Sequence, residues 1–256
     1  GAVGDLTWAA SNGRKPLLVT GSGMRVAFPH FSRIQDVLAE LERIVMRYLS
    51  GMLLLSTLWL TLIVVMCPGV VQLIYTSKWV PAVPALMLYA VSLSLDMMAW
   101  VVAVSLNGIG RLRTSTFMIV CRTLLNIPMA IFLVYRMPQA TAFNGVAIAY
   151  LISSVIAVPL VLRGLGPGAT TRILLGLRWL LLGPAVGIGL GLSASWLTAA
   201  LPLLVHVFIA GLAGMAGFGI AVWMIAPPWW KQRLLARFAA LRRLRSPLQP
   251  VNDPSP

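Results

Sequence analysis

The sequence predicts an all-α protein whose helices form a polytopic transmembrane bundle. Hydrophobic residues make up 59% of the chain and charged residues only 10%, whereas soluble proteins average about 45–50% and about 25%. The mean hydropathy is +0.89, and several apolar runs reach the roughly 20 residues that a helix needs to cross a bilayer. These observations exclude an ordinary soluble domain.

Six apolar stretches are long enough to be membrane spans. They are residues 48–74, 81–106, 114–135, 142–162, 179–200 and 202–226. The fifth stretch is rich in helix-perturbing residues, namely Gly183, Pro184, Gly187, Gly189 and Gly191. Small residues allow neighbouring helices to approach closely, so we interpret them as packing positions, with a flexing hinge as the alternative.

Basic residues alternate between the connections, which predicts the topology. One set of connections and flanks carries Arg33, Arg43, Arg47, Arg111, Arg113, Arg163, Arg172, Arg178, Lys231, Arg233, Arg237, Arg242, Arg243 and Arg245. The other set carries only Lys78 and Arg136. The positive-inside rule places the first set, and the carboxy-terminus, in the cytoplasm. We therefore interpret the net charge of +14 as basic cytoplasmic loops, with no nucleic acid as a partner.

Amphipathic segments flank the six spans. Residues 28–47 space their apolar side chains as a helix does, with acids on another side, and predict an interfacial helix running into the first span. After Pro227 and Pro228, "WWKQRLLARFAALRRLR" predicts a basic helix lying on anionic inner-leaflet lipids. The chain begins with Gly1 and shows no signal-peptide pattern, so we interpret it as the carboxy-terminal piece of a longer protein.

The opening stretch, residues 5–27, is polar along one side. At 100° per residue Thr7, Ser11, Arg14, Lys15, Ser22 and Arg25 fall within an arc of roughly 100°, interrupted only by Leu18. This predicts a polar-lined transmembrane helix with Arg14 and Lys15 near mid-depth and Arg25 at the cytoplasmic end. Charges at that depth have to face a wet or charge-compensating interior, and Pro16 would bend the helix there. The alternative is a solvated loop.

An acid and a base lie within consecutive spans. Asp96 and Arg122 are either a structural pair or part of a substrate or ion route. His206 suits a hydrogen-bonded helix position better than a proton relay, and Cys67 and Cys121 suit small buried hydrophobes. We find no carboxylate pair, nucleophile motif or metal-ligand cluster, so the sequence predicts neither an enzyme nor a cofactor.

Four motifs carry a family resemblance in order and spacing. They are "RVAFPHFSRIQD" (25–36), "SKWVPAVPALMLYAVSLSL" (77–95), "NGIGRLR" (107–113) and "FNGVAIAYLISSVIAVPLVL" (143–162). Together they resemble the carboxy-terminal half of the oligosaccharide flippases, the Wzx-type branch of the multidrug/oligosaccharidyl-lipid/polysaccharide exporter superfamily.

The resemblance implies a two-lobe transporter whose second lobe this chain supplies. Residues 1–47 would be the cavity-lining and interfacial helices, 48–162 the other four spans of that lobe, 163–226 two additional spans and 227–256 a basic cytoplasmic tail. In related lipid II flippases a cavity helix carries an embedded arginine, a part that Arg14 or Lys15 would play here. The missing amino-terminal lobe would have to come from another polypeptide or from the rest of the protein.

The implied function is flipping of undecaprenyl-diphosphate-linked oligosaccharides across the bacterial inner membrane by alternating access, for lipopolysaccharide or exopolysaccharide synthesis. Arginine suits pyrophosphate because its guanidinium fork matches the phosphate oxygens. We expect Arg14, Lys15, Arg25 and Arg122 to bind substrate and Asp96 to couple an ion. The alternatives are a cation or drug antiporter of the same architecture and a non-transporting scaffold that binds polysaccharide-assembly proteins.

Overall fold

The computed structural model describes residues 2–16, 21, 28–29, 31–33, 38–75, 77–138, 141–166 and 168–245. The helices are α1 (Ala2–Gly13), α3 (Leu38–Val70), the π-helical turn η1 (Val71–Tyr75), the 3-10 turn η2 (Ser77–Ala82), α4 (Val83–Gly108), α5 (Leu112–Arg136), α6 (Ala142–Arg163), α7 (Ala169–Leu177), α8 (Trp179–Leu197), α9 (Leu203–Ile225) and α10 (Pro228–Arg245). The described part of the chain contains no strand. The predicted all-α class is confirmed.

Six helical segments of the described residues are long and apolar enough to cross a membrane. These segments are Glu40–Tyr75, Ser77–Gly108, Leu112–Arg136, Ala142–Arg163, Ala169–Leu197 and Leu203–Ile225. Each contains or nearly contains one predicted span, because an uninterrupted apolar run of this length is the signal that identifies a spanning helix. The chain is therefore a polytopic helical bundle.

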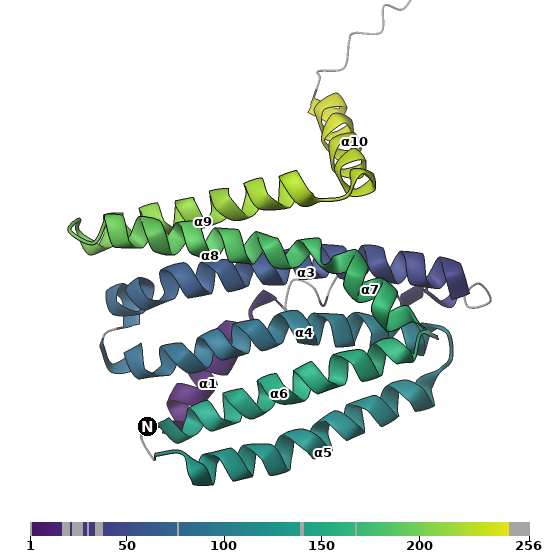
Figure 1. Ribbon diagram of the computed structural model, residues 1–256, viewed down its shortest axis with the longest axis horizontal. Helices are drawn as coiled ribbons and strands as arrows, with labels where there is room; N and C mark the ends of the chain where they lie inside the picture. The colour runs from purple at the N-terminus through teal and green to yellow at the C-terminus, as the bar shows by residue number, and fades with distance from the viewer. Residues whose placement is uncertain are drawn as a thin grey trace, which may run out of the picture.

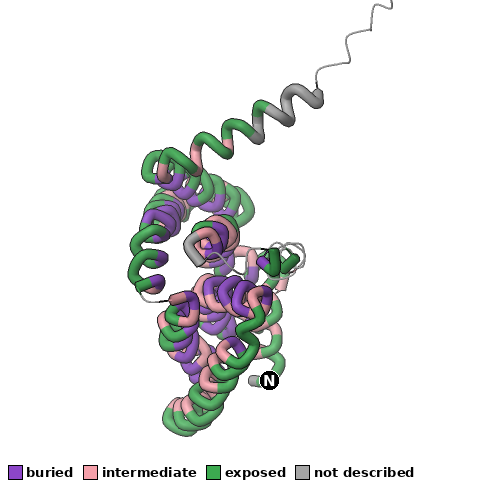
Figure 2. Tube along the Cα trace, turned by 90° about the vertical axis from the view of Figure 1, so that its right-hand side faces the viewer, coloured by how far each residue is buried: buried purple, intermediate pink, exposed green. Residues whose placement is uncertain are grey.

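The helices lie side by side, with α4 at the centre of one group. It packs against α3, α6, α1 and α5, whereas the hairpin of α8 and α9 packs on the other side of α3 (Figure 1). Buried residues line the inward sides of the helices in the end-on view of Figure 2. The outermost helix of the group, α5, buries only Ser115 and turns a long apolar surface outward, as suits a helix that faces lipid or another protein.

The hairpin of α8 and α9 is held by glycines. A methyl group at Gly187 would lie 2.8 Å from the carbonyl oxygen of Gly214 and 2.9 Å from the Thr61 side chain of α3. One at Gly191 would lie 2.6 Å from Val65, so larger residues at either site would separate the helices. The packing interpretation is confirmed for these glycines, while Gly189 faces open space.

Two stretches differ from the expected elements. The helix predicted as continuous over residues 5–27 is interrupted: α1 ends at Gly13, Arg14 and Lys15 form a turn, and the described residues Pro16 and Gly21 are again helical. Proline disfavours the helical conformation of the residue before it, which explains the break at this point. The second difference is α7, a short helix within the connection that follows the fourth predicted span.

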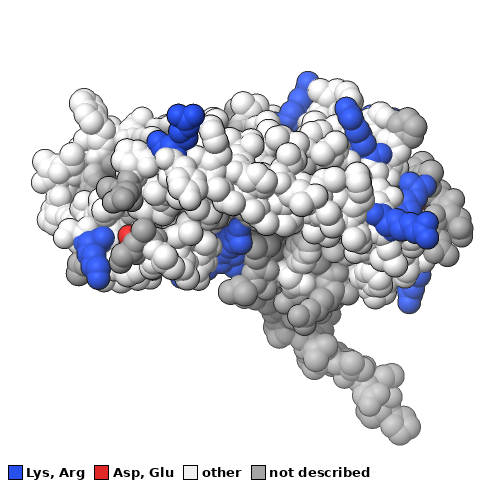
Figure 3. All heavy atoms as spheres, turned by 90° about the horizontal axis from the view of Figure 1, so that it is seen from below, with Lys and Arg blue, Asp and Glu red and all other residues white. Residues whose placement is uncertain are grey.

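Basic residues collect at one end of the bundle. The start of α3, the turn between α4 and α5, the α7 region and the start of α10 all lie at the right-hand end of Figure 1. The face shown in Figure 3 carries a dense group of lysine and arginine atoms at its right-hand end and very little acid. The fold thus brings together the connections that the charge pattern assigned to one side.

Candidate functional site

Polar side chains from three helices meet at mid-depth in the bundle. Asp96 lies near the middle of α4, Arg122 near the middle of α5, and Tyr150 and Ser154 one turn apart on α6. Above and below them the core is apolar: one hydrophobic cluster reaches Ala90 on α4, and the other resumes at Met98. The polar cluster occupies the level between the two.

Asp96 is the centre of this cluster. Its Oδ1 accepts hydrogen bonds from Arg122 Nη2 at 2.5 Å and from Ser154 Oγ at 2.9 Å, and its Oδ2 accepts one from the Tyr150 hydroxyl. The Asp96 side chain is only 10% exposed and that of Arg122 24%. A buried carboxylate is tolerated only when it is paired and hydrogen-bonded, and here both of its oxygens are used. Of the two interpretations of this acid and base, the structure shows them paired.

A second layer of hydrogen bonds supports the pair. Arg122 Nη2 also donates to Ser154 Oγ at 2.9 Å, and Asn126, one turn along α5, donates to Ser153 Oγ at 3.1 Å. Ser153 in turn donates to the carbonyl oxygen of Tyr150 at 2.9 Å. These contacts join α5 to α6 through polar groups, which compensates for the small area that α5 buries.

The Tyr150 ring lies close to two guanidinium groups. Arg14 Cζ is 4.2 Å from the ring centroid and Arg122 Cζ is 4.8 Å from it. Arg14 also lies 5.3 Å from the centroid of Tyr89, whose ring is 5.6 Å from that of Tyr150. Cations within about 6 Å of an aromatic face are attracted by its quadrupole. The two tyrosines therefore place Arg14 beside the Asp96 cluster.

No carboxylate of the described residues neutralises the charge of Arg14. The described residues contain three ion pairs, and Arg14 is in none of them. Its buried Nε has no hydrogen-bond partner among the described residues. The negative end of the α1 dipole lies nearby, but this is a partial charge. Arg14 is thus a partly buried cation that forms no ion pair with a described residue.

A pocket of about 580 Å³ opens beside Arg14. It is lined by Leu6, Thr7, Ala10, Ser11, Arg14, Lys15 and Tyr89, so it lies between α1 and α4. Lys15 is exposed and adds a second positive charge to its wall. The pocket combines two cations with hydroxyl groups and an aromatic ring, and none of the described residues that line it is an acid. Such a lining suits an anionic ligand.

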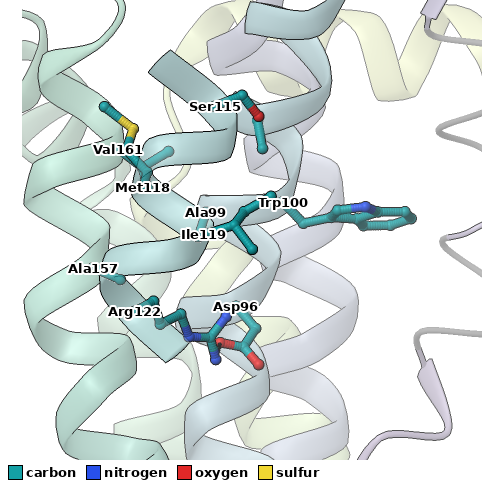
Figure 4. A pocket seen from close by; sticks show the side chains of 10 residues that line it. Asp96, Ala99, Trp100, Ser115, Met118, Ile119, Arg122, Ala157 and Val161 are labelled. Carbon is teal, nitrogen blue, oxygen red and sulfur yellow. Dashed lines mark hydrogen bonds and ion pairs between the residues drawn. The ribbon is translucent and has the colours of Figure 1, made fainter. Parts of the chain in front are cut away.

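A smaller pocket of about 240 Å³ lies on the other side of the polar cluster. In Figure 4, Asp96 and Arg122 point toward one another at its lower end, and Ser115 lies at its upper end. Its remaining walls are mostly apolar, including Trp100, Met118 and Ile119. This pocket gives the ion pair a short route to the outside of α4 and α5.

The structure brings together three of the five predicted site residues around one ring. Arg14, Arg122 and Asp96 all contact Tyr150, Lys15 lines the pocket of Arg14, and Arg25 lies outside the described residues. His206 contacts the hydroxyls of Ser195 and Thr198, as expected for a satisfied helix histidine. Within the described residues no group of acids, cysteines and histidines could hold a metal ion.

Sequence reasoning missed the residues that link these charges. Tyr150 and Ser154 lie one turn apart on α6, as do Arg122 and Asn126 on α5, and Tyr89 precedes Asp96 by two turns on α4. Polar side chains recurring at helical spacing in the middle of apolar spans indicate one polar face per helix. That pattern would have identified the polar residues of the cluster, but not which of them contact one another across helices.

These features define a multi-pass membrane protein with a buried charged cluster beside a cationic pocket. Residues 18–84 match a family model described as "Polysaccharide biosynthesis protein". The match supports a role in polysaccharide biosynthesis. It covers α3 and the start of α4, and does not include Arg14, Asp96 or Arg122. Searches of curated proteins and of solved structures return no match.

Proposed function

We propose that this chain is the carboxy-terminal half of a flippase that moves polyprenyl-diphosphate-linked oligosaccharides across the bacterial inner membrane. The observation that carries the proposal is the guanidinium of Arg14, which pairs with no described carboxylate and lines a pocket whose described wall holds two cations and no acid. The family match to residues 18–84 supports the polysaccharide context.

In this proposal the substrate pyrophosphate lies in the pocket between α1 and α4. The Nε and terminal nitrogens of Arg14 donate charge-assisted hydrogen bonds to its oxygens, and Lys15 supplies a further positive charge. The Tyr89 and Tyr150 rings hold the guanidinium in place before the ligand arrives. Arg25 is a further candidate ligand from the sequence.

Asp96 and Arg122 have a different part in the proposal. Because Arg122 is already paired, it contacts substrate only if Asp96 is protonated or moves. Protonation of Asp96 would free the Arg122 charge and loosen the Tyr150 hydrogen bond, which would couple a proton to the geometry of the Arg14 site. This is how Asp96 would act as the ion-coupling residue.

Alternating access requires a second lobe, and we propose that it is supplied by the rest of the protein or by a partner polypeptide. The basic end of the bundle and α10 would lie in the cytoplasm, against anionic inner-leaflet lipids and polysaccharide-assembly proteins. A cation or drug antiporter fits less well, because both oxygens of Asp96 are occupied and the Arg14 pocket contains no acid.

The test is export of lipid-linked oligosaccharide in a flippase-deficient bacterium that expresses the protein carrying this sequence. We expect Arg14→Ala/Lys15→Ala to abolish export at matched membrane abundance and unchanged folding. The control is Lys78→Ala/Arg136→Ala, which removes the same charge from exposed positions outside the pocket and should leave export intact. Normal export by the first variant would contradict the substrate site and favour the scaffold alternative.

A further inference from the structure

A second cationic pocket lies at the basic end of the bundle, remote from Arg14. Its volume is about 600 Å³, within the range of pockets that bind small organic molecules. The residues that line it come from α3, α7 and α10, and they are Glu42, Arg43, Met46, Arg47, Gly176, Trp229 and Arg233. Three of the seven are arginines.

Specific contacts hold the walls of the pocket in place: α7 is joined to α3, and α10 is joined to α8 next to them. Arg172 of α7 donates two hydrogen bonds to the Glu42 carboxylate of α3, at 2.8 and 2.7 Å. A methyl group at Gly176 would lie 2.7 Å from Met46, so α7 lies directly on α3. Trp230 of α10 packs on Trp179 of α8, with ring centroids 5.7 Å apart. The pocket is therefore a built feature of the fold.

The positive charges at this pocket exceed the negative ones. Glu42 is engaged by Arg172, and Glu40 pairs with Arg43 at 3.0 Å. Neither Arg47 nor Arg233 takes part in an ion pair among the described residues. Arg43, Arg47 and Arg233 line the same pocket, so their like charges lie near one another. Like charges held together by the fold favour an anion between them.

We propose that the pocket between α3, α7 and α10 binds a phosphate group, with Arg47 and Arg233 as its two main ligands. The guanidinium fork donates parallel hydrogen bonds to phosphate oxygens and keeps its charge at any physiological pH. Trp229, on the rim, is 39% exposed, a placement typical of tryptophan beside lipid headgroups. The phosphate is therefore that of an anionic lipid or a free phosphate of the surrounding solution.

Ligand binding here would anchor α10 to the bundle, because Arg47 and Arg233 come from different helices. The bound phosphate would replace repulsion between two helices by a shared contact. This inference does not depend on flipping, since it involves none of the residues around Tyr150.

The experiment is native mass spectrometry of the purified full chain in detergent, titrated with phosphatidylglycerol, phosphatidylcholine or inorganic phosphate. We expect the Arg47→Gln/Arg233→Gln variant to bind phosphatidylglycerol at least about tenfold more weakly than the native chain, because two charge-assisted contacts are lost. Arg113→Gln/Arg163→Gln, which removes the same charge from exposed residues at the same end, should bind normally.

The titrations with phosphatidylglycerol and with inorganic phosphate distinguish the two sources of phosphate. Tighter binding of phosphatidylglycerol than of inorganic phosphate assigns a lipid headgroup, and the reverse assigns the free ion. Equal loss of binding in both double variants, or none in either, overturns the proposal. If the Arg47→Gln/Arg233→Gln chain fails to fold, Arg47→Lys and Arg233→Lys keep the charge but remove the fork, and each should weaken binding by a smaller factor.

Discussion

Arg14 and Arg122 hold their guanidinium groups against the same tyrosine ring, yet their surroundings differ in charge. Arg122 is paired with Asp96 and hydrogen-bonded to Ser154, so its charge is neutralised within the bundle. Arg14 lies against two aromatic rings, has no carboxylate partner among the described residues, and lines an open pocket. The first arrangement suits holding helices together, and the second leaves a cation available to a ligand.

The comparison shows that burial of a charge does not by itself indicate function. A neutralised pair inside a membrane costs little once formed, but removal of one partner leaves the other exposed to the full desolvation penalty. A cation without a carboxylate partner already carries this desolvation cost in the folded protein. Replacing it by a neutral residue should therefore affect ligand binding more than folding. The predictions below test this division between the two arginines.

The largest effect is expected at Asp96. Asp96→Asn leaves Arg122 buried without a carboxylate and should lower the free energy of unfolding by about 3–5 kcal/mol. The double variant Asp96→Asn/Arg122→Gln should lose less, because no unpaired charge remains. Denaturant titration in detergent, followed by helical circular dichroism, measures both. A double variant no more stable than the single one would contradict the pairing.

A smaller effect is expected at Tyr150. Tyr150→Phe removes the hydroxyl that donates to Asp96 but keeps the ring, and should cost about 1–3 kcal/mol. Tyr150→Leu also removes the surface that both guanidiniums contact, and should cost about 1 kcal/mol more. Tyr135→Phe, at an exposed position on α5, is the control and should be neutral. Equal losses for Phe and Leu would show that the ring contacts contribute nothing.

The smallest effect on stability is expected at Arg14. Arg14→Gln removes a cation held only by ring contacts, so the free energy of unfolding should change by less than about 1 kcal/mol. The same variant should reduce export strongly if Arg14 binds the pyrophosphate. Stability and export are measured on the same membrane preparations, with Lys15→Gln alongside. A loss of stability comparable to that of Asp96→Asn would make Arg14 a structural residue.

The spans could be predicted because their signal is local. An apolar run of about 20 residues identifies a membrane helix whatever surrounds it, and Pro and Gly mark where such a run ends. The interruption of the helix before Pro16 was harder to predict. Pro16 indicated a bend, but a continuous helix was expected across it. Only the structure shows that a turn at Arg14 and Lys15 interrupts it after Gly13.

The site was predicted in part, and the partners of its charges were not. Asp96 and Arg122 stand out because charges are rare in apolar spans. Tyr150 and Ser154 do not, since both occur commonly in such helices. Whether Arg122 faces Asp96 or a cavity depends on how α4, α5 and α6 are rotated about their axes, and no local pattern in the sequence determines that rotation.

The sequence by itself determined the class of fold, the six spans and the end of the bundle at which basic residues collect. These features follow from the hydropathy and charge of consecutive residues, whatever the tertiary contacts. Only the tertiary structure decided that Arg122 pairs with Asp96 while Arg14 pairs with no described carboxylate, and that Arg47 and Arg233 share a pocket. Those outcomes depend on contacts between helices far apart in sequence, where a side chain's neighbours are set by packing.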